Sequence, residues 1–139
     1  MSEDIQKSID STDYWDSKIL DFNCNFFGDE VYLYLENDDS TSWKISFLIC
    51  HSVQYETDAA WSKTWRKDKG YVRDMNSQQL GYYGQDITVN ENKEHEGFYD
   101  VSFHLSIMTG KITCKEIKVE KLSNETLNFF WKNEERKKD

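Results

Sequence analysis

The strongest hydrophobic pattern in this chain runs from residue 97 to residue 122 and predicts a β-hairpin. Every second residue of its first half is apolar: Tyr99, Val101, Phe103, Leu105 and Ile107. This period is typical of a half-buried strand. Thr109-Gly110 is expected to form the turn, because Gly accepts the positive φ that tight turns require. Folding the chain there pairs Ile107 with Ile112 and Leu105 with Cys114.

The second strand of this hairpin changes phase after Cys114. Its apolar residues up to Cys114 are at even-numbered positions, whereas the next two, Ile117 and Val119, are at odd-numbered positions. One extra residue at Lys115-Glu116, a β-bulge, would restore the register. We then expect Phe103 to pair with Ile117 and Val101 with Val119.

Three further strands are predicted in the first 55 residues. The first covers residues 20–26, and its apolar positions are Leu20, Phe22, Cys24 and Phe26. Gly28-Asp29 breaks it, and Val31, Leu33 and Leu35 form the inner face of a second strand. The polar residues 37–42 then lead into a long third strand from Trp43 to Tyr55. Short loops between the three strands predict an antiparallel meander.

The remaining segments carry weaker patterns. Residues 57–69 predict a short helix, in which Trp61 and Trp65 share one face and Gly70 can end it. A short strand is expected at residues 86–90, followed by a charged loop at residues 91–96. Residues 126–131 suit an edge strand, and a capped helix is the alternative.

Together these elements predict a mainly β protein: an antiparallel sheet or a two-layer β-sandwich with one short helix at about residues 57–69. A chain of 139 residues with 15% aromatics can bury a core of useful size. The absence of Pro and the presence of only six Gly argue against linkers. We therefore expect a single domain over residues 1–139, with loose or weakly helical ends at 1–13 and 132–139.

The net charge of −9 is confined to the first half of the chain. Residues 1–60 contain three Lys against thirteen Asp and Glu, whereas the rest of the chain is almost balanced. An acidic domain repels phosphate backbones, so direct nucleic-acid binding is not expected. A basic protein partner fits this charge, although acidic charge also serves solubility. The N-terminus has neither the basic start nor the apolar run of a signal peptide or membrane anchor, so we expect a cytoplasmic protein.

No catalytic or metal-binding signature is found. The three His, at positions 51, 95 and 104, are scattered, and no pattern places a nucleophile beside a base. The three Cys, at positions 24, 50 and 114, all fall in predicted strands without a C-x-x-C spacing. Buried free thiols in a reducing cytoplasm are expected. We predict no enzyme activity and no cofactor.

Two sets of residues are candidates for binding a partner. Carboxylates steer an encounter, and rigid aromatic rings anchor it. The acidic set lies at strand ends and turns of the meander, where it is expected to gather along one edge of the sheet: Asp16, Asp29, Glu30, Glu36, Asp38, Asp39, Glu56 and Asp58. The aromatic set lies in the least regular part of the chain: Trp61, Trp65, Tyr82 and Tyr83. These rings can instead close one end of the core.

The first 55 residues resemble the opening of small all-β immunity proteins from bacterial polymorphic-toxin systems. The resemblance rests on the run Tyr14 to Ile19 and on the strands at residues 31–35 and 43–47. Trp15 stands where many of these proteins have a His. The resemblance implies a cytoplasmic, antitoxin-like protein that blocks a cognate toxin and has no catalysis of its own. It transfers no functional residue to this chain.

Three functions are therefore considered. The first is a non-enzymatic module that binds a basic protein, of which immunity to a toxin is the most specific form. The second is a mimic of DNA charge that inhibits a nucleic-acid enzyme. The third is a small-molecule-binding or enzymatic β domain with an aromatic pocket near Trp61 and Tyr82. The sequence does not determine the oligomeric state.

Overall fold

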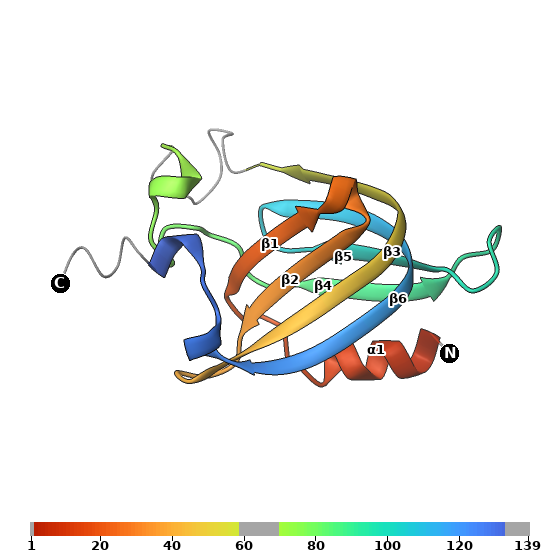
Figure 1. Cartoon of the computed structure of the whole chain (residues 1–139), viewed down its shortest axis with the longest axis horizontal. Helices are drawn as coiled ribbons and strands as arrows, with labels where there is room; N and C mark the ends of the chain where they lie inside the picture. Colours follow the sequence, from red (N-terminus) through yellow and green to blue (C-terminus); the bar gives the residue numbers. More distant parts are fainter. Residues whose placement is uncertain (1, 59–69, 133–139) are drawn as a thin grey trace.

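The computed structural model describes residues 2–58 and 70–132, which form one strongly curved antiparallel sheet (Figure 1). The mainly β fold expected from the sequence is confirmed. Six strands follow the spatial order β1-β2-β3-β6-β5-β4. The elements are α1 (Ser2–Asp10), β1 (Ile19–Asn25), β2 (Glu30–Glu36), β3 (Thr41–Thr57), β4 (Asp86–Glu91), β5 (Tyr99–His104) and β6 (Met108–Ser123), with three short 3₁₀ turns, η1 (Phe26–Gly28), η2 (Val72–Asp74) and η3 (Asn124–Thr126).

The meander of β1, β2 and β3 is confirmed. β2 pairs with β1 on one side and with β3 on the other, both antiparallel. Its odd-numbered residues Val31, Leu33 and Leu35 are buried and belong to the main core. The alternation of β2 therefore places its apolar side chains inside the curve of the sheet.

The hairpin of β5 and β6 forms, but its turn and register differ from the prediction. Leu105 donates its backbone N–H to the carbonyl of Met108 at 2.7 Å, and Ser106 takes the positive φ of 65°. Gly110 lies inside β6, directly opposite Phe103. The Phe103 ring occupies the space that a Cβ at residue 110 would need. Gly110 therefore makes room for a cross-strand ring and does not form the turn.

The shifted turn changes every predicted pair of the hairpin. Val101 faces Ile112, and the predicted pairs of Val101 with Val119 and Phe103 with Ile117 are wrong. The change of phase in β6 does lie at Lys115 and Glu116, which are both exposed. β5 pairs with β6 only as far as Cys114, and beyond it β6 pairs with β3 alone. The irregular step between these two long strands lies at Cys50 and Ser52.

The N-terminal segment is not a loose end, because α1 covers the outer edge of β4. The Gln6 side chain donates to the carbonyl of Ile87 at 2.8 Å and accepts the N–H of Val89 at 2.8 Å. The Tyr14 hydroxyl accepts the N–H of Ile87 at 3.1 Å. One amide and one phenol thus satisfy the backbone groups that an edge strand leaves open. Ile9 of α1 is fully buried in the core.

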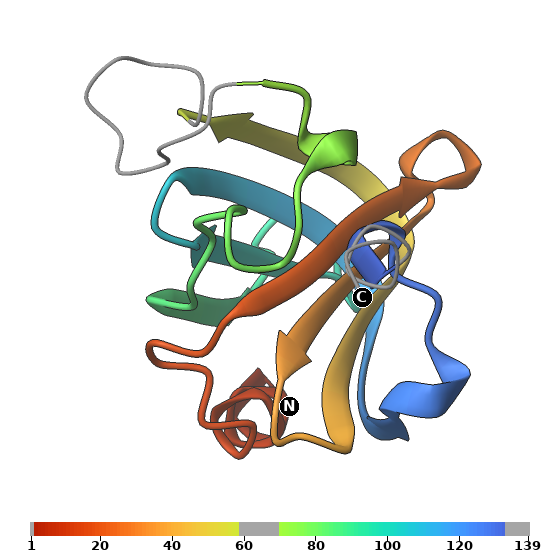
Figure 2. The same ribbon diagram turned by 90° about the vertical axis from the view of Figure 1, so that its left-hand side faces the viewer.

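A short bridge draws the two ends of the curved sheet together (Figure 2). Ile19 donates to the carbonyl of Tyr82 at 2.9 Å, and Gly84 donates to the carbonyl of Ser17 at 2.9 Å. Gly84 also lies so close to Tyr14 that a Cβ there would be 2.2 Å from the Tyr14 carbonyl oxygen. Residues 82–84, which precede β4, are therefore hydrogen-bonded to and packed against the start of β1.

A second, smaller core lies where the C-terminal part of the chain returns to β1. It consists of Leu20, Met75, Leu80, Phe129 and Trp131. The Trp131 indole N–H donates to the carbonyl of Leu20 at 2.8 Å. The edge strand predicted at residues 126–131 is not formed, since the backbone there is irregular and becomes helical at residues 130–132. The helix predicted at residues 57–69 falls mostly outside the described residues, and β3 continues through Thr57.

Candidate functional site

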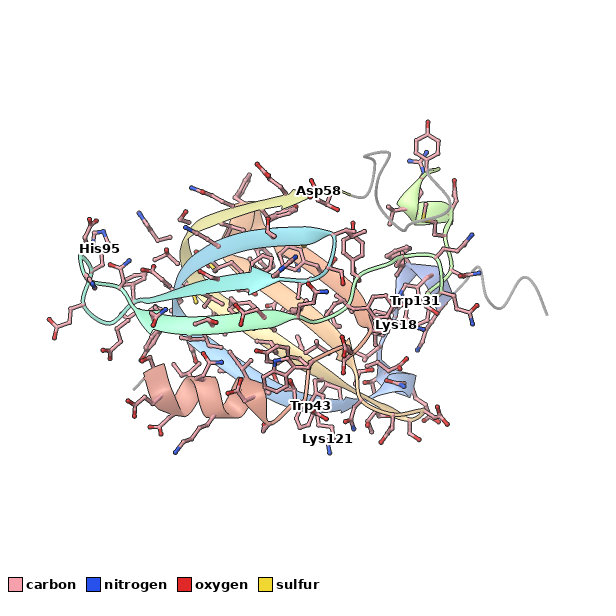
Figure 3. All side chains as sticks on the ribbon, turned by 180° about the vertical axis from the view of Figure 1, so that it is seen from behind. Lys18, Trp43, Asp58, His95, Lys121 and Trp131 are labelled. Carbon is pink, nitrogen blue, oxygen red and sulfur yellow. The ribbon has the colours of Figure 1, made fainter. Side chains whose placement is uncertain are left out.

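The acidic residues of the meander do not gather along one edge. The connection from β1 to β2 and the connection from β2 to β3 lie at opposite ends of β2, a strand of seven residues and about 23 Å. Glu30 lies at the first end, and Glu36, Asp38 and Asp39 at or beyond the second. Asp58 follows the far end of β3, and Figure 3 shows it well away from Trp43 near the β2–β3 turn. The predicted acidic edge is wrong.

Asp38 has a structural role in the β2–β3 turn. Its carboxylate accepts the N–H groups of Ser40 and Thr41 at 2.9 and 2.7 Å and the Thr41 hydroxyl at 2.8 Å. These hydrogen bonds, the hydroxyl first, hold the pKa of Asp38 below its ordinary value. Asp16 is also a turn residue, with φ of 62° and its N–H bonded to the carbonyl of Gly84 at 2.7 Å.

The remaining acidic candidates have different surroundings. Glu30 accepts a short hydrogen bond from the Tyr32 hydroxyl. Glu36 uses its backbone N–H to bind the carbonyl of Lys18 at 2.9 Å and keeps an exposed side chain. Glu56 lies opposite Thr109 near the end of β3. The carboxylates therefore act as separate surface charges.

The aromatic set supports the core on the part that the structure describes. The Tyr82 hydroxyl hydrogen-bonds the Thr57 hydroxyl at 2.7 Å, and its ring packs against both cores. Tyr83 forms an isolated bridge with Lys18 and accepts the Ser106 hydroxyl at its carbonyl. Both side chains are half-buried. The positions of Trp61 and Trp65 lie outside the described residues.

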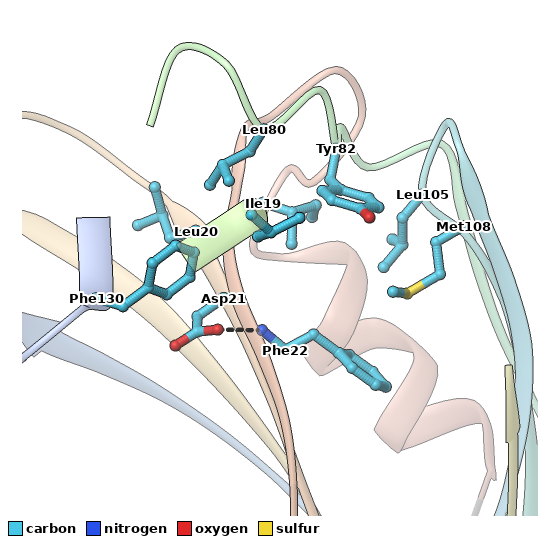
Figure 4. Close-up of a pocket in the computed structure, with 10 residues that line it drawn as sticks. Ile19, Leu20, Asp21, Phe22, Leu80, Tyr82, Leu105, Met108 and Phe130 are labelled. Atoms are coloured by element: carbon cyan, nitrogen blue, oxygen red, sulfur yellow. Dashed lines mark hydrogen bonds between the residues drawn. The ribbon is translucent and has the colours of Figure 1, made fainter. Parts of the chain in front are cut away.

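A small apolar pocket of about 150 Å³ opens beside β1 (Figure 4). Its walls come from β1, the segment before β4, the β5–β6 turn and Phe130: Ile19, Leu20, Asp21, Phe22, Val72, Leu80, Tyr82, Leu105, Met108 and Phe130. Among the described residues that line it, the one charged group is Asp21, whose carboxylate accepts the N–H of Phe22 at 2.9 Å. Burial raises the pKa of Asp21. The described part of the lining brings no Ser, Cys, His, Lys or second carboxylate beside Asp21.

The clearest exposed apolar feature is the turn between β1 and β2. Phe26 is 68% exposed and Phe27 is fully exposed, so neither ring has a place in the core. The sequence assigned Phe26 to the first strand, but β1 ends at Asn25 and Phe26 begins the turn η1. A groove of about 260 Å³ runs beside the two rings and reaches β3: Phe26, Phe27, Gly28, Asp29, Cys50, His51, Ser52 and Val53. We call these residues the turn surface.

The backbone of this turn is left-handed at three successive residues. Phe26, Phe27 and Gly28 have φ of 54°, 62° and 94°. Such angles suit Gly but cost a residue with a large side chain about 1–2 kcal/mol. Tertiary contacts hold the turn in place. Asp29 donates to the carbonyl of Phe26 at 3.1 Å, and its own carbonyl accepts the N–H of Cys50 at 2.9 Å.

The β4–β5 loop joins the turn surface through two His rings. The ring of His51 on β3 lies 5.6 Å from the ring of His95, and His95 lies 6.3 Å from the ring of Phe98. Figure 3 shows His95 at one end of the molecule and Trp131 at the other. The loop residues 91–96 carry three Glu against one Lys, and Asp29 and Glu30 add two carboxylates beside the turn. The end of the sheet that carries the turn surface and the β4–β5 loop therefore combines exposed aromatic rings with several carboxylates.

The Cys residues occupy three different environments. Cys114 is fully buried, as expected, whereas Cys24 is exposed and Cys50 is half-buried. The expectation of a buried Cys24 is wrong, because β1 extends past the core after Phe22. Among residues 2–58 and 70–132, no three His, Cys, Asp or Glu side chains are grouped so that they could hold a metal ion. No helix in the described part of the chain is long and apolar enough to cross a membrane.

An exposed pair of aromatic rings with carboxylates nearby is typical of a protein-binding module. The family model described as Immunity protein PIM7 matches residues 1–121, and the chain belongs to this family. The resemblance to immunity proteins seen in the first 55 residues is thereby confirmed. None of the curated proteins matches the chain.

A solved structure shares the fold. It is described as the crystal structure of an uncharacterized protein from Neisseria gonorrhoeae, and it is 11% identical in sequence with a TM-score of 0.52. The match covers 78% of this chain and 94% of that one. At this identity the similarity concerns the fold alone.

The sequence could have indicated the turn surface through one signal. Two consecutive Phe directly before Gly28-Asp29 place large apolar side chains at a chain reversal, where burial on both sides is not possible. Alternation alone assigned Phe26 to the strand and left Phe27 without a role.

Proposed function

We propose that this chain is a non-enzymatic immunity protein that binds a cognate basic toxin through the turn surface. The observation that carries the proposal is the exposure of Phe26 and Phe27 on a left-handed turn. Strained backbone conformations persist where the surrounding structure fixes them, and they concentrate at binding sites. Membership of the immunity protein family supports a toxin as the partner.

The two Phe rings supply the apolar anchor of the proposed interface. Rings that are rigidly presented lose little conformational freedom on binding, and they fill pockets at the centre of interfaces. Ile49, which is half-exposed with φ of 56°, lies on β3 between Leu48, which faces Glu30, and Cys50, which is bonded to Asp29.

The carboxylates around the rings supply the steering. Asp29 and Glu30 directly follow the turn in sequence, and the acidic loop at residues 91–96 reaches the turn surface where the His95 ring lies against the His51 ring. A basic surface approaches such a region faster than a neutral one, and the acceleration falls as salt rises. The proposed basic partner would therefore approach the end of the sheet that carries His95, away from the β2–β3 turn.

The test expresses the product of the gene that neighbours the gene of this chain in bacteria, with and without this protein, and follows growth. Wild-type protein should restore growth, whereas Phe26→Ser with Phe27→Ser should not, at equal amounts of folded protein. Tyr71→Ser is the matched control, since Tyr71 is 69% exposed but lies outside the turn surface. Full protection by the double variant would contradict the proposed site. Failure of the wild-type protein to protect would contradict the function itself.

A further inference from the structure

Cys50 and Cys114 lie directly opposite each other on β3 and β6. Cys50 donates its backbone N–H to Asp29 on the side away from β6. The two Cys are therefore a pair without backbone hydrogen bonds between them, and in such pairs the Cα atoms are about 4.5 Å apart. Disulfides span Cα separations of about 4.4–6.8 Å. The strand pairing alone thus brings the two residues within bonding range.

The two side chains project to the same face of the sheet. Directly opposite residues of an antiparallel pair share a face, and both of these residues contact the main core. The Cys50 thiol donates to the carbonyl of Phe47 at 3.3 Å, and the two thiols are close enough for each to shift the pKa of the other. The pairing and the shared face therefore place both thiols on the same side of neighbouring strands.

The two thiols differ in access and in acidity. Cys50 is half-buried and lines the groove of the turn surface, whereas Cys114 is fully buried behind it. The hydrogen bond from Cys114 lowers the pKa of Cys50 and raises that of Cys114. A reachable thiol with a lowered pKa is the one that attacks, and its neighbour resolves the product.

We propose that Cys50 and Cys114 form a reactive dithiol that peroxide converts to a cross-strand disulfide, with Cys24 left free. The Cys50 thiolate attacks one oxygen of hydrogen peroxide, the O–O bond breaks, and a sulfenic acid and one water form after protonation. The Cys114 sulfur then attacks the Cys50 sulfur, loses its proton and displaces the hydroxyl group as a second water. Two thiols are oxidised, and one peroxide is reduced to two waters. This chemistry does not depend on the proposed partner.

Trypsin separates the three Cys, which makes the product easy to identify. Cys24 falls in the peptide 19–44, Cys50 in 45–63 and Cys114 in 112–115. The folded wild-type protein is treated with hydrogen peroxide, its remaining thiols are alkylated after denaturation, and the digest is analysed by mass spectrometry. We expect peptides 45–63 and 112–115 to be joined, with two hydrogen atoms lost, and Cys24 to be alkylated. The free thiols should fall from three to one per chain.

Single variants control for the alternatives. Cys24→Ser should give the same joined peptides, and Cys50→Ser should give none at equal exposure to peroxide. Peptide 19–44 joined to 45–63 would overturn the proposal, because it would make Cys24 the partner of Cys50. Oxidation of Cys50 to sulfinic acid without any joined peptide would overturn it as well, since Cys114 would then not be its resolving thiol.

Discussion

The ring of Phe103 lies across Gly110 on the neighbouring strand, with its Cζ atom 2.3 Å from the position that a Cβ at residue 110 would take. Backbone and side-chain atoms of Gln54 and Tyr55 lie within 2.7 and 2.8 Å of the same position. β3, β5 and β6 therefore meet at one residue that has no side chain. This close approach fixes the register of the hairpin.

Gly110→Ala should destabilise the protein, because three strands would have to move apart. We expect a loss of about 1–3 kcal/mol in the free energy of unfolding, the usual cost of overpacking. Urea unfolding followed by Trp fluorescence measures it. Gly70→Ala is the control, since no atom of residues 2–58 or 72–132 lies within 4 Å of its Cβ position, and it should change stability by less than about 0.5 kcal/mol. Equal effects of the two substitutions would contradict the close approach.

Gln6→Ala should expose the edge of β4. The variant leaves the N–H of Val89 without its side-chain acceptor and the carbonyl of Ile87 with only the Tyr14 hydroxyl, at 3.4 Å. Such losses cost about 1–3 kcal/mol where the groups stay buried. Hydrogen exchange followed by NMR should show faster exchange of the Val89 amide. Lys7→Ala, on the exposed side of the same helix, should leave that amide protected. An unchanged Val89 amide in Gln6→Ala would show that α1 does not cover the edge.

The Tyr32 hydroxyl should titrate at unusually high pH. Its hydrogen bond to the Glu30 carboxylate raises the pKa of Tyr32 from 10.0 to about 12. Because the folded pKa is the higher one, this stabilisation is present below pH 10 and is lost as pH rises from 10 toward 12. NMR of the Tyr ring carbons measures the pKa. Glu30→Gln should lower it toward 10, whereas Glu36→Gln on the same strand should not. A pKa of 10 in the wild type would exclude the bond.

The first three strands of the fold could be predicted from the sequence, because β2 and β3 bury one face and alternate with period two. The hairpin was predicted in the right segment, but Gly110 was assigned to the turn. Sequence does not distinguish a Gly that turns the chain from one that admits a ring from the next strand. For residues 1–13 the sequence left a loose or weakly helical segment open, because a helix of nine residues depends on tertiary contacts such as those of Gln6.

The candidate site was less accessible to sequence reasoning. The acidic residues are close in sequence, but antiparallel strands send consecutive turns to opposite ends of the sheet. The carboxylate of Asp38 accepts backbone hydrogen bonds within the β2–β3 turn and so stabilises the turn. The pairing of His51 with His95 joins segments 44 residues apart, and no local pattern reveals it. Exposure of Phe26 and Phe27 depends on where β1 leaves the core, which only the structure shows.

Electrostatic steering should be found at the turn surface and not at the β2–β3 turn. Asp29→Lys should lower the association rate with the basic toxin at low salt, and the difference should shrink as the screening length falls below about 10 Å. Asp39→Lys is the matched charge reversal at the opposite end of β2 and should have little effect. It is preferred to Asp38→Lys, which would also break the turn. An association rate that responds to Asp39→Lys and not to Asp29→Lys would contradict the turn surface as the interface and indicate the β2–β3 turn instead.

The most direct measurement compares stability and toxin dissociation in one variant, Phe27→Gly. Gly accepts the left-handed backbone of residue 27, so the free energy of unfolding should be unchanged or higher by up to about 1 kcal/mol. Loss of the exposed ring should speed dissociation from the toxin by about 30-fold, which corresponds to an anchor of about 2 kcal/mol. Surface-binding kinetics and urea unfolding on the same preparation give both values. A variant that is equally stable and dissociates at the wild-type rate would contradict the assignment of the turn surface as the toxin-binding site.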